Sequence, residues 1–386
     1  MINKTNLFLS PNKVIYGNGT AELAGKEAAQ FGAKKALVVT DKGVMKADLL
    51  ASVQDSLKAQ KISYEIFDQV EAEPPARNVA DGAKMAVDYG ADIIIGVGGG
   101  SSLDSAKGIA IIAKLGGNIL DFAGFDLVPQ RGLPKILLPT TAGTGSEVTR
   151  VGVFKDEAEN LKKAVYSNFA LADVAIVDPL LTLSMPPKVT ADTGIDAMIH
   201  AIESCTSLNA TPFSEIMGLE AIRLIAENLP AAYAKASNIT ARANMSLAAT
   251  LAGLALNSGG AAAVHGLSNV LGIKYHLSHG RANAVLLPYI IDYNKIGDLN
   301  KYAAIAQAVG IDTEGLSPYE ASEELVDYLF NLLEIIDIPV RLSDYGITEA
   351  DIPTLVEGGM KLARLFVPNP RDMTEEDVKN IFTSAL

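Results

Sequence analysis

Short apolar runs alternate with amphipathic stretches over the first half of the chain. Runs rich in β-branched residues are typical of strands, and the helical spacing of apolar positions over residues 79–89 is typical of a helix. This alternation predicts βαβ units and therefore an α/β domain built on a parallel sheet. The predicted strands cover residues 35–40, 64–67, 92–97, 135–138 and 175–179.

The pattern changes after Pro187. From Lys188 onward the sequence is rich in Ala and Leu, helical in period and poor in β-branched runs, most clearly over 191–205, 212–228 and 241–256. We therefore predict two domains: an α/β domain over residues 1–187 and an all-helical domain over residues 188–386.

The composition disfavours some binding partners and cellular compartments. The 386 residues carry a formal net charge of −13, which disfavours nucleic acid and membrane surfaces because both attract basic proteins. The single cysteine, Cys205, excludes an internal disulfide, and the N-terminus lacks the features of a signal peptide, so we expect a cytoplasmic protein. No charged residue lies between Arg242 and Lys274, but polar residues interrupt this stretch, and we expect a buried helix there.

A glycine loop follows the predicted strand 92–97. It consists of Gly98, Gly99, Gly100 and Ser101, and the residues after it, including Asp104 and Lys107, read as a helix. A strand, glycines and a helix N-terminus form an anion site, because backbone N–H groups and the helix dipole face the ligand. A tight turn without a ligand is the alternative, and Ser101 stands where the usual dinucleotide motif has its last glycine. We favour a phosphate site.

Two further segments could complete a nucleotide site. Residues 139–147 follow the next strand and contain Thr140, Thr141 and Thr144, whose hydroxyls could bond a pyrophosphate or ribose or could cap a helix. Asp41 ends the first long strand, where a carboxylate could accept hydrogen bonds from ribose hydroxyls.

The histidines all lie in the helical half. Asp196 and His200 are four residues apart, which places them on one helix face where they could grip a cation or form an ordinary polar contact. His265 and His279 would lie about 21 Å apart in one straight helix, so they can share an ion only if the chain breaks between Gly272 and His279. One Asp and three His suit Fe²⁺ or Zn²⁺. His276 is either a residue that lines the site or a solvated loop residue.

In combination, these motifs resemble the iron-dependent (group III) alcohol dehydrogenases, in particular members of the lactaldehyde reductase and 1,3-propanediol dehydrogenase type. The resemblance extends over almost the whole chain. It is carried by Val39-Thr40-Asp41-Lys42, the glycine loop with Asp104 and Lys107, residues 139–149, Met185-Pro186-Pro187, residues 193–201, His265-Gly266, His279-Gly280-Arg281-Ala282-Asn283 and Asn369-Pro370-Arg371.

The resemblance implies a dinucleotide-binding N-terminal domain, a metal-binding helical domain and an active site in the cleft between them. It implies that Asp196, His200, His265 and His279 hold one divalent metal, that the glycine loop takes the pyrophosphate, and that Asp41 favours NAD(H) over NADP(H). It also implies a homo-oligomer that interconverts small primary alcohols or diols and aldehydes by hydride transfer. The other residues implied to contact the cofactor are Asp104, Thr140, Thr141, Thr144, Val153, Lys162 and Leu181.

The sequence departs from the family at several positions. Asn269 stands where many relatives carry a further histidine, and Leu256 and Leu365 occupy variable positions of the cleft. The two leucines predict a small, partly apolar substrate pocket.

Two other functions compete with this prediction. A lyase resembling dehydroquinate synthase also uses NAD and a metal, but it needs clustered Lys and Arg, and residues 265–281 supply only Lys274 and Arg281. A non-catalytic binding module is disfavoured by the complete set of four metal ligands together with the phosphate loop.

Overall fold

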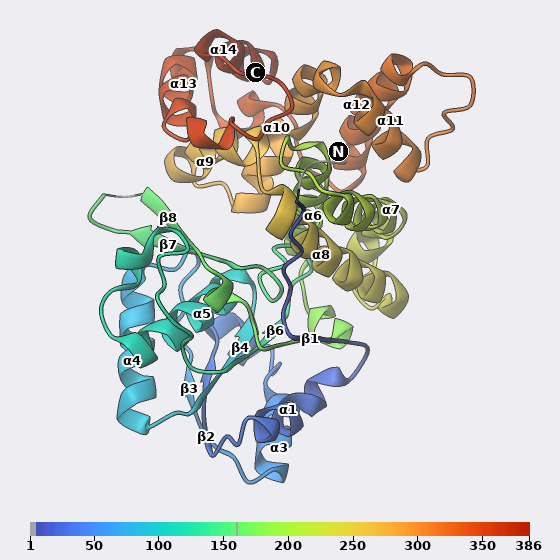
Figure 1. Ribbon diagram of the computed structural model, residues 1–386. Helices are drawn as coiled ribbons and strands as arrows, with labels where there is room; N and C mark the ends of the chain where they lie inside the picture. Colours follow the sequence, from blue (N-terminus) through green and yellow to red (C-terminus); the bar gives the residue numbers. More distant parts are fainter. Residues whose placement is uncertain (1–4, 160) are drawn as a thin grey trace. The chain divides into compact units, whose positions relative to one another are not determined.

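The computed structural model describes residues 5–159 and 161–386, which form two compact units (Figure 1). One unit is Leu9–Ser184, and the other is Met185–Leu386 together with residues 5–8. The division after Ser184 lies next to the predicted boundary at Pro187, but residues 5–8 belong to the helical unit.

A parallel sheet of six strands forms the centre of the first unit, as the alternating pattern predicted. All five predicted strands are present, and a sixth, β1, lies at an edge of the sheet and pairs with β9 alone. The strand order is β1-β9-β6-β4-β2-β3. The strands are β1 (Lys13–Tyr16), β2 (Lys35–Val39), β3 (Ser63–Phe67), β4 (Ile93–Gly98), β6 (Lys135–Pro139) and β9 (Val174–Val177).

Helices cover both faces of this sheet. Neighbouring strand residues point to opposite faces, so Ile94 packs in the hydrophobic cluster that includes helices α4 and α5, whereas Ile93 and Ile95 pack in the cluster with α1 and α3. The helices of this unit are α1 (Ala24–Gln30), α2 (Lys42–Lys46), α3 (Ala51–Ala59), α4 (Ala76–Tyr89) and α5 (Gly100–Leu115).

A small second sheet is the part of this unit that the sequence did not predict. It consists of β5 (Gly124–Phe125), β8 (Leu161–Tyr166) and β7 (Val151–Asp156) in that order, with β7 and β8 antiparallel. Its lysine-rich, half-exposed strands lack the long β-branched runs that marked the main sheet.

The second unit is helical, and the three predicted helical stretches fall within α6, α7 and α8. These helices pack against one another with very little space: a Cβ on Gly218 would lie 2.4 Å from Cys205 Sγ, and one on Gly259 would lie 2.3 Å from the Ser204 carbonyl oxygen. The helices are α6 (Pro187–Thr206), α7 (Pro212–Ala234), α8 (Ile239–Gly259), α9 (Ala263–Tyr275), α10 (His279–Asn294), α11 (Leu299–Ala308), α12 (Pro318–Ile335), α13 (Ile352–Met360) and α14 (Glu375–Ser384).

Helix α8 explains the uncharged stretch. Among the described residues it alone is long and apolar enough to cross a membrane, and 56% of its most apolar window is buried inside the protein. Ala248, Ala252 and Ala255 are fully buried, which accounts for the apolar sequence as a core helix packed against α6 and α7.

Candidate functional site

Three helices bring the predicted metal ligands together. Helix α6 carries Asp196 and His200 one turn apart, α9 carries His265 in its first turn, and α10 begins at His279. Asp196 Oδ1 lies 3.7 Å from both His265 Nε2 and His279 Nε2. One ligand atom from each of these three residues lies within 4.8 Å of the others, which is close enough to share one ion.

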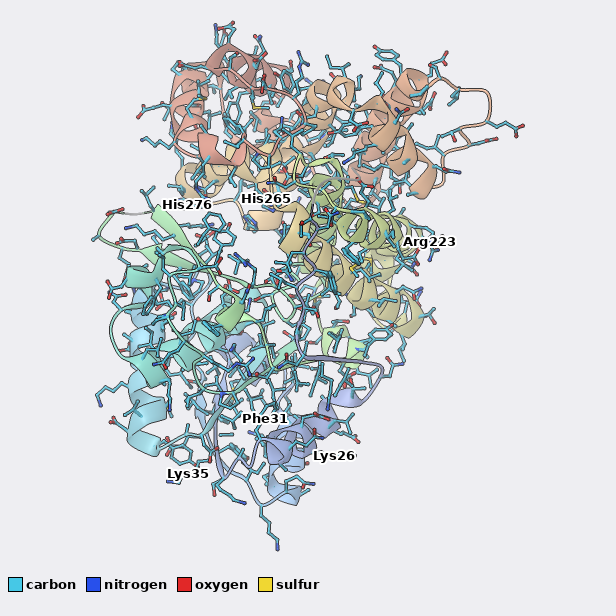
Figure 2. All side chains as sticks on the ribbon, viewed as in Figure 1. Lys26, Phe31, Lys35, Arg223, His265 and His276 are labelled. Atoms are coloured by element: carbon cyan, nitrogen blue, oxygen red, sulfur yellow. The ribbon has the colours of Figure 1, made fainter. Side chains whose placement is uncertain are left out.

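The break that this grouping requires is present. Helix α9 ends at Tyr275, and His276 follows in the left-handed conformation with φ 57° and ψ 29°. The chain then turns into α10 at His279, as the sequence predicted. The His276 side chain is exposed at this turn. Figure 2 labels this residue together with His265. A catalytic part for His276 stays a prediction.

The fourth predicted ligand, His200, lies beside the group of three. Its ring stacks on that of His265 with centroids 4.7 Å apart and planes inclined by 16°, and the His265 and His279 rings are 5.4 Å apart. The described residues within mutual reach of one ion are Asp196, His265 and His279. We refer to these three residues and His200 as the histidine cluster.

The environment of His265 fits a divalent metal ion. Its ring is 9% exposed, and Nδ1 lies 2.6 Å from Glu203 Oε2. The other ring nitrogen, Nε2, is buried with no hydrogen-bond partner among the described residues. A buried polar atom without a partner is costly, and an ion next to the Asp196 carboxylate would satisfy it. Imidazole and carboxylate donors suit Fe²⁺ and Zn²⁺.

Burial and charge oppose each other at this site. Burial acts to raise the pKa of Asp196, but the three imidazoles and the Asn283 amide outweigh it, so the pKa lies below its usual value. Burial likewise acts to lower the pKa of His265, but Glu203 and Asp196 outweigh it and the pKa is raised. The site therefore favours a negative carboxylate that attracts positive charge.

Sequence reasoning missed the residues that support the cluster. Asn283 donates from Nδ2 to Asp196 Oδ1 over 2.8 Å, and Ser268 Oγ donates to Asn283 Oδ1. Asp192 accepts from Ser278 Oγ at 2.6 Å and Arg281 Nε at 2.7 Å, which fixes the start of α10. Glu203 lies three residues after His200 and Asn283 four after His279, so helical spacing was the signal that could have identified both.

In the first unit, the glycine loop joins β4 to α5. Gly99 is the N-cap of α5 and has no side chain with which to bond the first turn. Phosphate binding at this helix N-terminus stays a prediction. A Cβ on Gly100 would lie 2.8 Å from Thr144 Cγ2, and one on Gly99 would lie 3.4 Å from Thr141 Cγ2. The glycines therefore also let the threonine loop approach closely.

Asp41 lies at the carboxyl end of β2 beside this loop. Its Oδ1 accepts from the backbone N–H groups of Gly43 and Val44 and caps α2, and its Oδ2 accepts from Ser102 Oγ over 2.9 Å. Asp41 thus links two helices of the nucleotide unit. Its contact with a ribose stays a prediction.

The structure changes the interpretation of Asp104. Its Oδ1 accepts from Ser146 Oγ at 2.6 Å, its Oδ2 accepts from the Val153 N–H at 2.9 Å, and the buried Lys107 ammonium lies 3.3 Å away. Both carboxylate oxygens are used within the fold. Asp104 therefore holds the threonine loop and β7 against α5, and its direct contact with the cofactor stays a prediction.

Three other residues predicted to contact the cofactor differ in their surroundings: two are buried, and the third forms an ion pair. Thr140 is buried, and its N–H donates to the Gly98 carbonyl, while Leu181 in the short helix η4 (Pro179–Thr182) packs within the core. Lys162 on β8 forms an ion pair with Glu73, and the Glu73 N–H donates to Ser101 Oγ. Lys162 is thus tied to the glycine loop through one exposed residue.

Comparison with known proteins identifies the family. The description "Iron-containing alcohol dehydrogenase" matches residues 11–179, and "Fe-containing alcohol dehydrogenase family, C-terminal" matches residues 190–386. Long-chain-alcohol dehydrogenase 1 of Geobacillus thermodenitrificans (strain NG80-2) is 40% identical over 96% of this chain and 94% of its own. The 1,3-propanediol dehydrogenase of Citrobacter freundii is 40% identical over 98% of both chains.

A solved structure gives the same result. The crystal structure of 1,3-propanediol oxidoreductase superposes with a TM-score of 0.96 at 38% identity and covers 99% of this chain and 100% of that one. The chain belongs to the iron-containing alcohol dehydrogenase family. As a member it is an NAD-linked oxidoreductase, and this class is supported over the dehydroquinate synthase alternative.

Proposed function

We propose that this enzyme interconverts small primary alcohols or diols and their aldehydes by hydride transfer to and from NAD(H). We also propose that Asp196, His200, His265 and His279 hold the metal. The observation that carries the proposal is the convergence of Asp196, His265 and His279 within 4.8 Å, with the buried His265 Nε2 left without a hydrogen-bond partner among the described residues.

The chain's own residues prepare this site for a polar substrate. A divalent ion bound there supplies Lewis-acid activation of an alcohol hydroxyl or an aldehyde carbonyl. Asn283 holds the Asp196 carboxylate, and Asp192 holds the start of α10. The His279 side chain is 43% exposed, so the cluster is accessible on that side.

In the nucleotide unit, we assign the pyrophosphate to the glycine loop at the start of α5, where the helix dipole favours negative charge. Thr140, Thr141 and Thr144 line the cofactor, Lys162 reaches its nicotinamide ribose, and Val153 and Leu181 lie near the nicotinamide. Asp41, at the end of β2, gives the preference for NAD(H). The close approach of the glycine and threonine loops supports this arrangement.

Leu365 supports a small, partly apolar substrate. It lies in the short helix η8 (Ala363–Leu365), and a Cβ on Gly266, next to His265, would lie 3.4 Å from Leu365 Cβ. Arg150 and Arg364 are the cations that would favour an anionic substrate instead. Arg150 already pairs with Asp126 and Asn168, and Arg364 is exposed.

The two cations that a lyase would need near the histidine cluster are engaged in ion pairs within the protein. Lys274 pairs with Asp351, and Arg281 pairs with Asp192, so neither is available for a substrate phosphate. We further propose a cytoplasmic homo-oligomer that binds neither nucleic acid nor membranes. The net charge of −13 supports the absence of these partners, the single buried cysteine supports the compartment, and the homo-oligomer rests on the family resemblance alone.

A substrate panel tests the proposal. Reduced nicotinamide absorbance is followed with short alcohols, diols and aldehydes, using metal-stripped, Fe²⁺-loaded and Zn²⁺-loaded enzyme. We expect the metal-loaded enzyme to turn over short neutral substrates and the metal-stripped enzyme to be inactive. An acid-bearing aldehyde with the highest kcat/KM would contradict the substrate class, and full activity without metal would contradict the site.

A further inference from the structure

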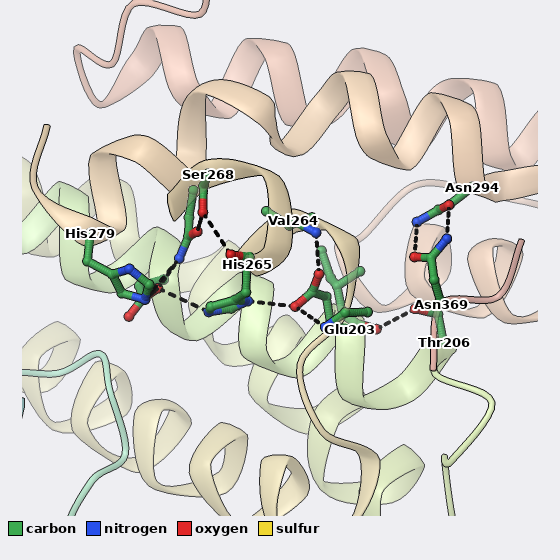
Figure 3. A network of polar contacts seen from close by, with 12 residues as sticks. Glu203, Thr206, Val264, His265, Ser268, His279, Asn294 and Asn369 are labelled. Atoms are coloured by element: carbon green, nitrogen blue, oxygen red, sulfur yellow. Dashed lines mark hydrogen bonds and ion pairs between the residues drawn. The ribbon is translucent and has the colours of Figure 1, made fainter. Parts of the chain in front are cut away.

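Glu203 is a buried carboxylate with no place in the predicted metal site. It lies on α6, is 3% exposed, and contacts one metal-binding residue and the start of α9 at once (Figure 3). Its Oε2 is 2.6 Å from His265 Nδ1 and accepts from the Ala262 N–H at 2.9 Å. Its Oε1 accepts from the Val264 N–H at 2.7 Å.

The two backbone bonds show which partner carries the proton on the His265 contact. Both carboxylate oxygens already accept backbone N–H bonds. Glu203 is therefore the acceptor in this group of contacts, and we assign His265 Nδ1–H as the donor of the third bond. In the neutral ring the lone pair is then on Nε2, the nitrogen that lies 3.7 Å from Asp196 Oδ1.

The same contacts fix the direction of the ring. Ala262 is the N-cap of α9 and provides no side-chain cap of its own, and Val264 is the second residue of the helix. Glu203 takes that place from a neighbouring helix. One side chain therefore sets both the position of the backbone that carries His265 and the rotation of the imidazole.

We propose that Glu203 is the positioning residue of the metal site: it selects the Nδ1–H tautomer of His265 and directs Nε2 at the ion. The inference rests on the proposed metal site. Metal binding then requires Glu203 in addition to the ligands. If His265 had the other tautomer, it would present an N–H group to the ion and could not bind it.

Glu203→Gln is the sharpest test because it changes one acceptor into a donor at nearly the same size. If the amide nitrogen faces Ala262 and His265, it donates to Nδ1 and moves the ring proton to Nε2. If it faces Val264, two donors oppose each other at the start of α9. Either orientation breaks one of the three contacts, and the first reverses the tautomer.

The readouts are the tautomer and the metal affinity, neither of which needs turnover. With only four histidines in the chain, ¹⁵N-histidine labelling gives few NMR signals. In metal-free protein at alkaline pH, the wild type is expected to show Nδ1–H at His265. Glu203→Gln is expected to lose this signal and to bind Zn²⁺ about 10- to 100-fold more weakly by calorimetry.

Two further variants separate positioning from simple loss of structure. Asp178→Asn is the matched control, because Asp178 is a buried carboxylate that accepts from the N–H groups of Gly19, Ala21 and Leu180 and belongs to the first unit, whereas the histidine cluster belongs to the helical unit. It is expected to lower Tm but to leave Zn²⁺ affinity unchanged. Glu203→Asp keeps an acceptor-only group, and it is expected to restore the Nδ1–H tautomer and part of the affinity.

The outcomes distinguish this inference from the proposed function. Wild-type protein that fails to bind Zn²⁺ or Fe²⁺ would refute the metal site itself. A wild type that binds metal while Glu203→Gln binds it equally well would refute the role of Glu203 alone. The role is also refuted if Glu203→Gln loses metal affinity while His265 keeps Nδ1–H, because the loss would then not follow the tautomer, or if Glu203→Asp loses the tautomer as Glu203→Gln does.

Discussion

The glycine loop of the nucleotide unit and the histidine cluster of the helical unit differ in how far apart their residues lie in the sequence. The loop is formed by consecutive residues: β4 ends at Gly98, Gly99 caps α5, and the proposed binding groups are successive backbone N–H groups. The cluster is distributed: its side chains come from α6, α9 and α10 and meet only after these helices pack.

This difference decides what each site needs for support. A backbone site needs space, so the glycines and the neighbouring Thr141 and Thr144 define it. A side-chain site needs orientation, so it depends on buried carboxylates and amides behind the ligands, such as Glu203, Asp192 and Asn283. The two sites should therefore fail independently, and the predictions below test that independence.

The largest effect is expected from His279→Ala. The side chain is 43% exposed, so little packing is lost, but the cluster loses a donor, and metal content and turnover should fall together toward the level of chelated wild-type enzyme. NADH binding, measured by fluorescence, should remain because the glycine loop is untouched. Loss of NADH binding in the same variant would show that the two sites are not independent.

Gly98→Ala should produce the converse result. Gly98 has φ +154°, and a Cβ there would lie 2.6 Å from Ser102 Cβ, so the loop must shift. Backbone strain and overpacking of this kind cost about 1–3 kcal/mol each, and NADH affinity is expected to fall while metal content stays at the wild-type level.

Gly116→Ala is the matched control for Gly98→Ala. Gly116 lies at the other end of α5 with φ +72°, and a Cβ added there would have nothing within 4 Å. Its φ of 72° and ψ of −173° are nearly restricted to glycine, so the substitution should cost about 1–3 kcal/mol of stability without loss of NADH binding. Equal NADH affinity in Gly98→Ala and wild type would contradict the phosphate assignment.

Asp41→Asn should have an intermediate effect confined to the choice of cofactor. Asn is as good an N-cap as Asp, so the cap of α2 is kept while the negative charge next to a 2′-phosphate is removed. The wild-type preference for NAD(H) is expected to be at least about tenfold, or about 1.4 kcal/mol, and the variant should reduce it. The ratio of kcat/KM for the two cofactors measures it, and equal values in the wild type would contradict the role of Asp41.

The smallest effect is expected at Cys205, on the same helix as Asp196 but packed against the start of α7. Burial raises the pKa of this thiol to about 12, so alkylation by iodoacetamide at neutral pH should be slow in native protein and fast after unfolding. Because the unfolded thiol ionises from about pH 9, its contribution to stability should fall as pH rises above that value. Rapid native alkylation would mean that α6 and α7 separate readily.

The sequence predicted the parts whose signals are local. All five predicted strands and the helical second half are present, because apolar runs and helical spacing are read from neighbouring residues. The α9–α10 break was predicted from a distance argument, since His265 and His279 could not share an ion otherwise. The sequence analysis did not predict features that depend on tertiary contacts: the β7–β8 hairpin, the hydrogen bonds of Asp104 within the fold, and the contact of Glu203 with His265.

Because the residues of the histidine cluster lie on α6, α9 and α10, a bound ion would also hold these three helices together. Metal that binds only folded protein adds stability in proportion to the logarithm of its free concentration, about 4 kcal/mol at a thousand times its Kd. When metal is scarce, this addition disappears, and unfolded or locally open chains become more frequent substrates for proteolysis. The abundance of the enzyme would then follow the supply of metal with no regulatory protein, so that cells poor in metal would not accumulate an enzyme they could not use.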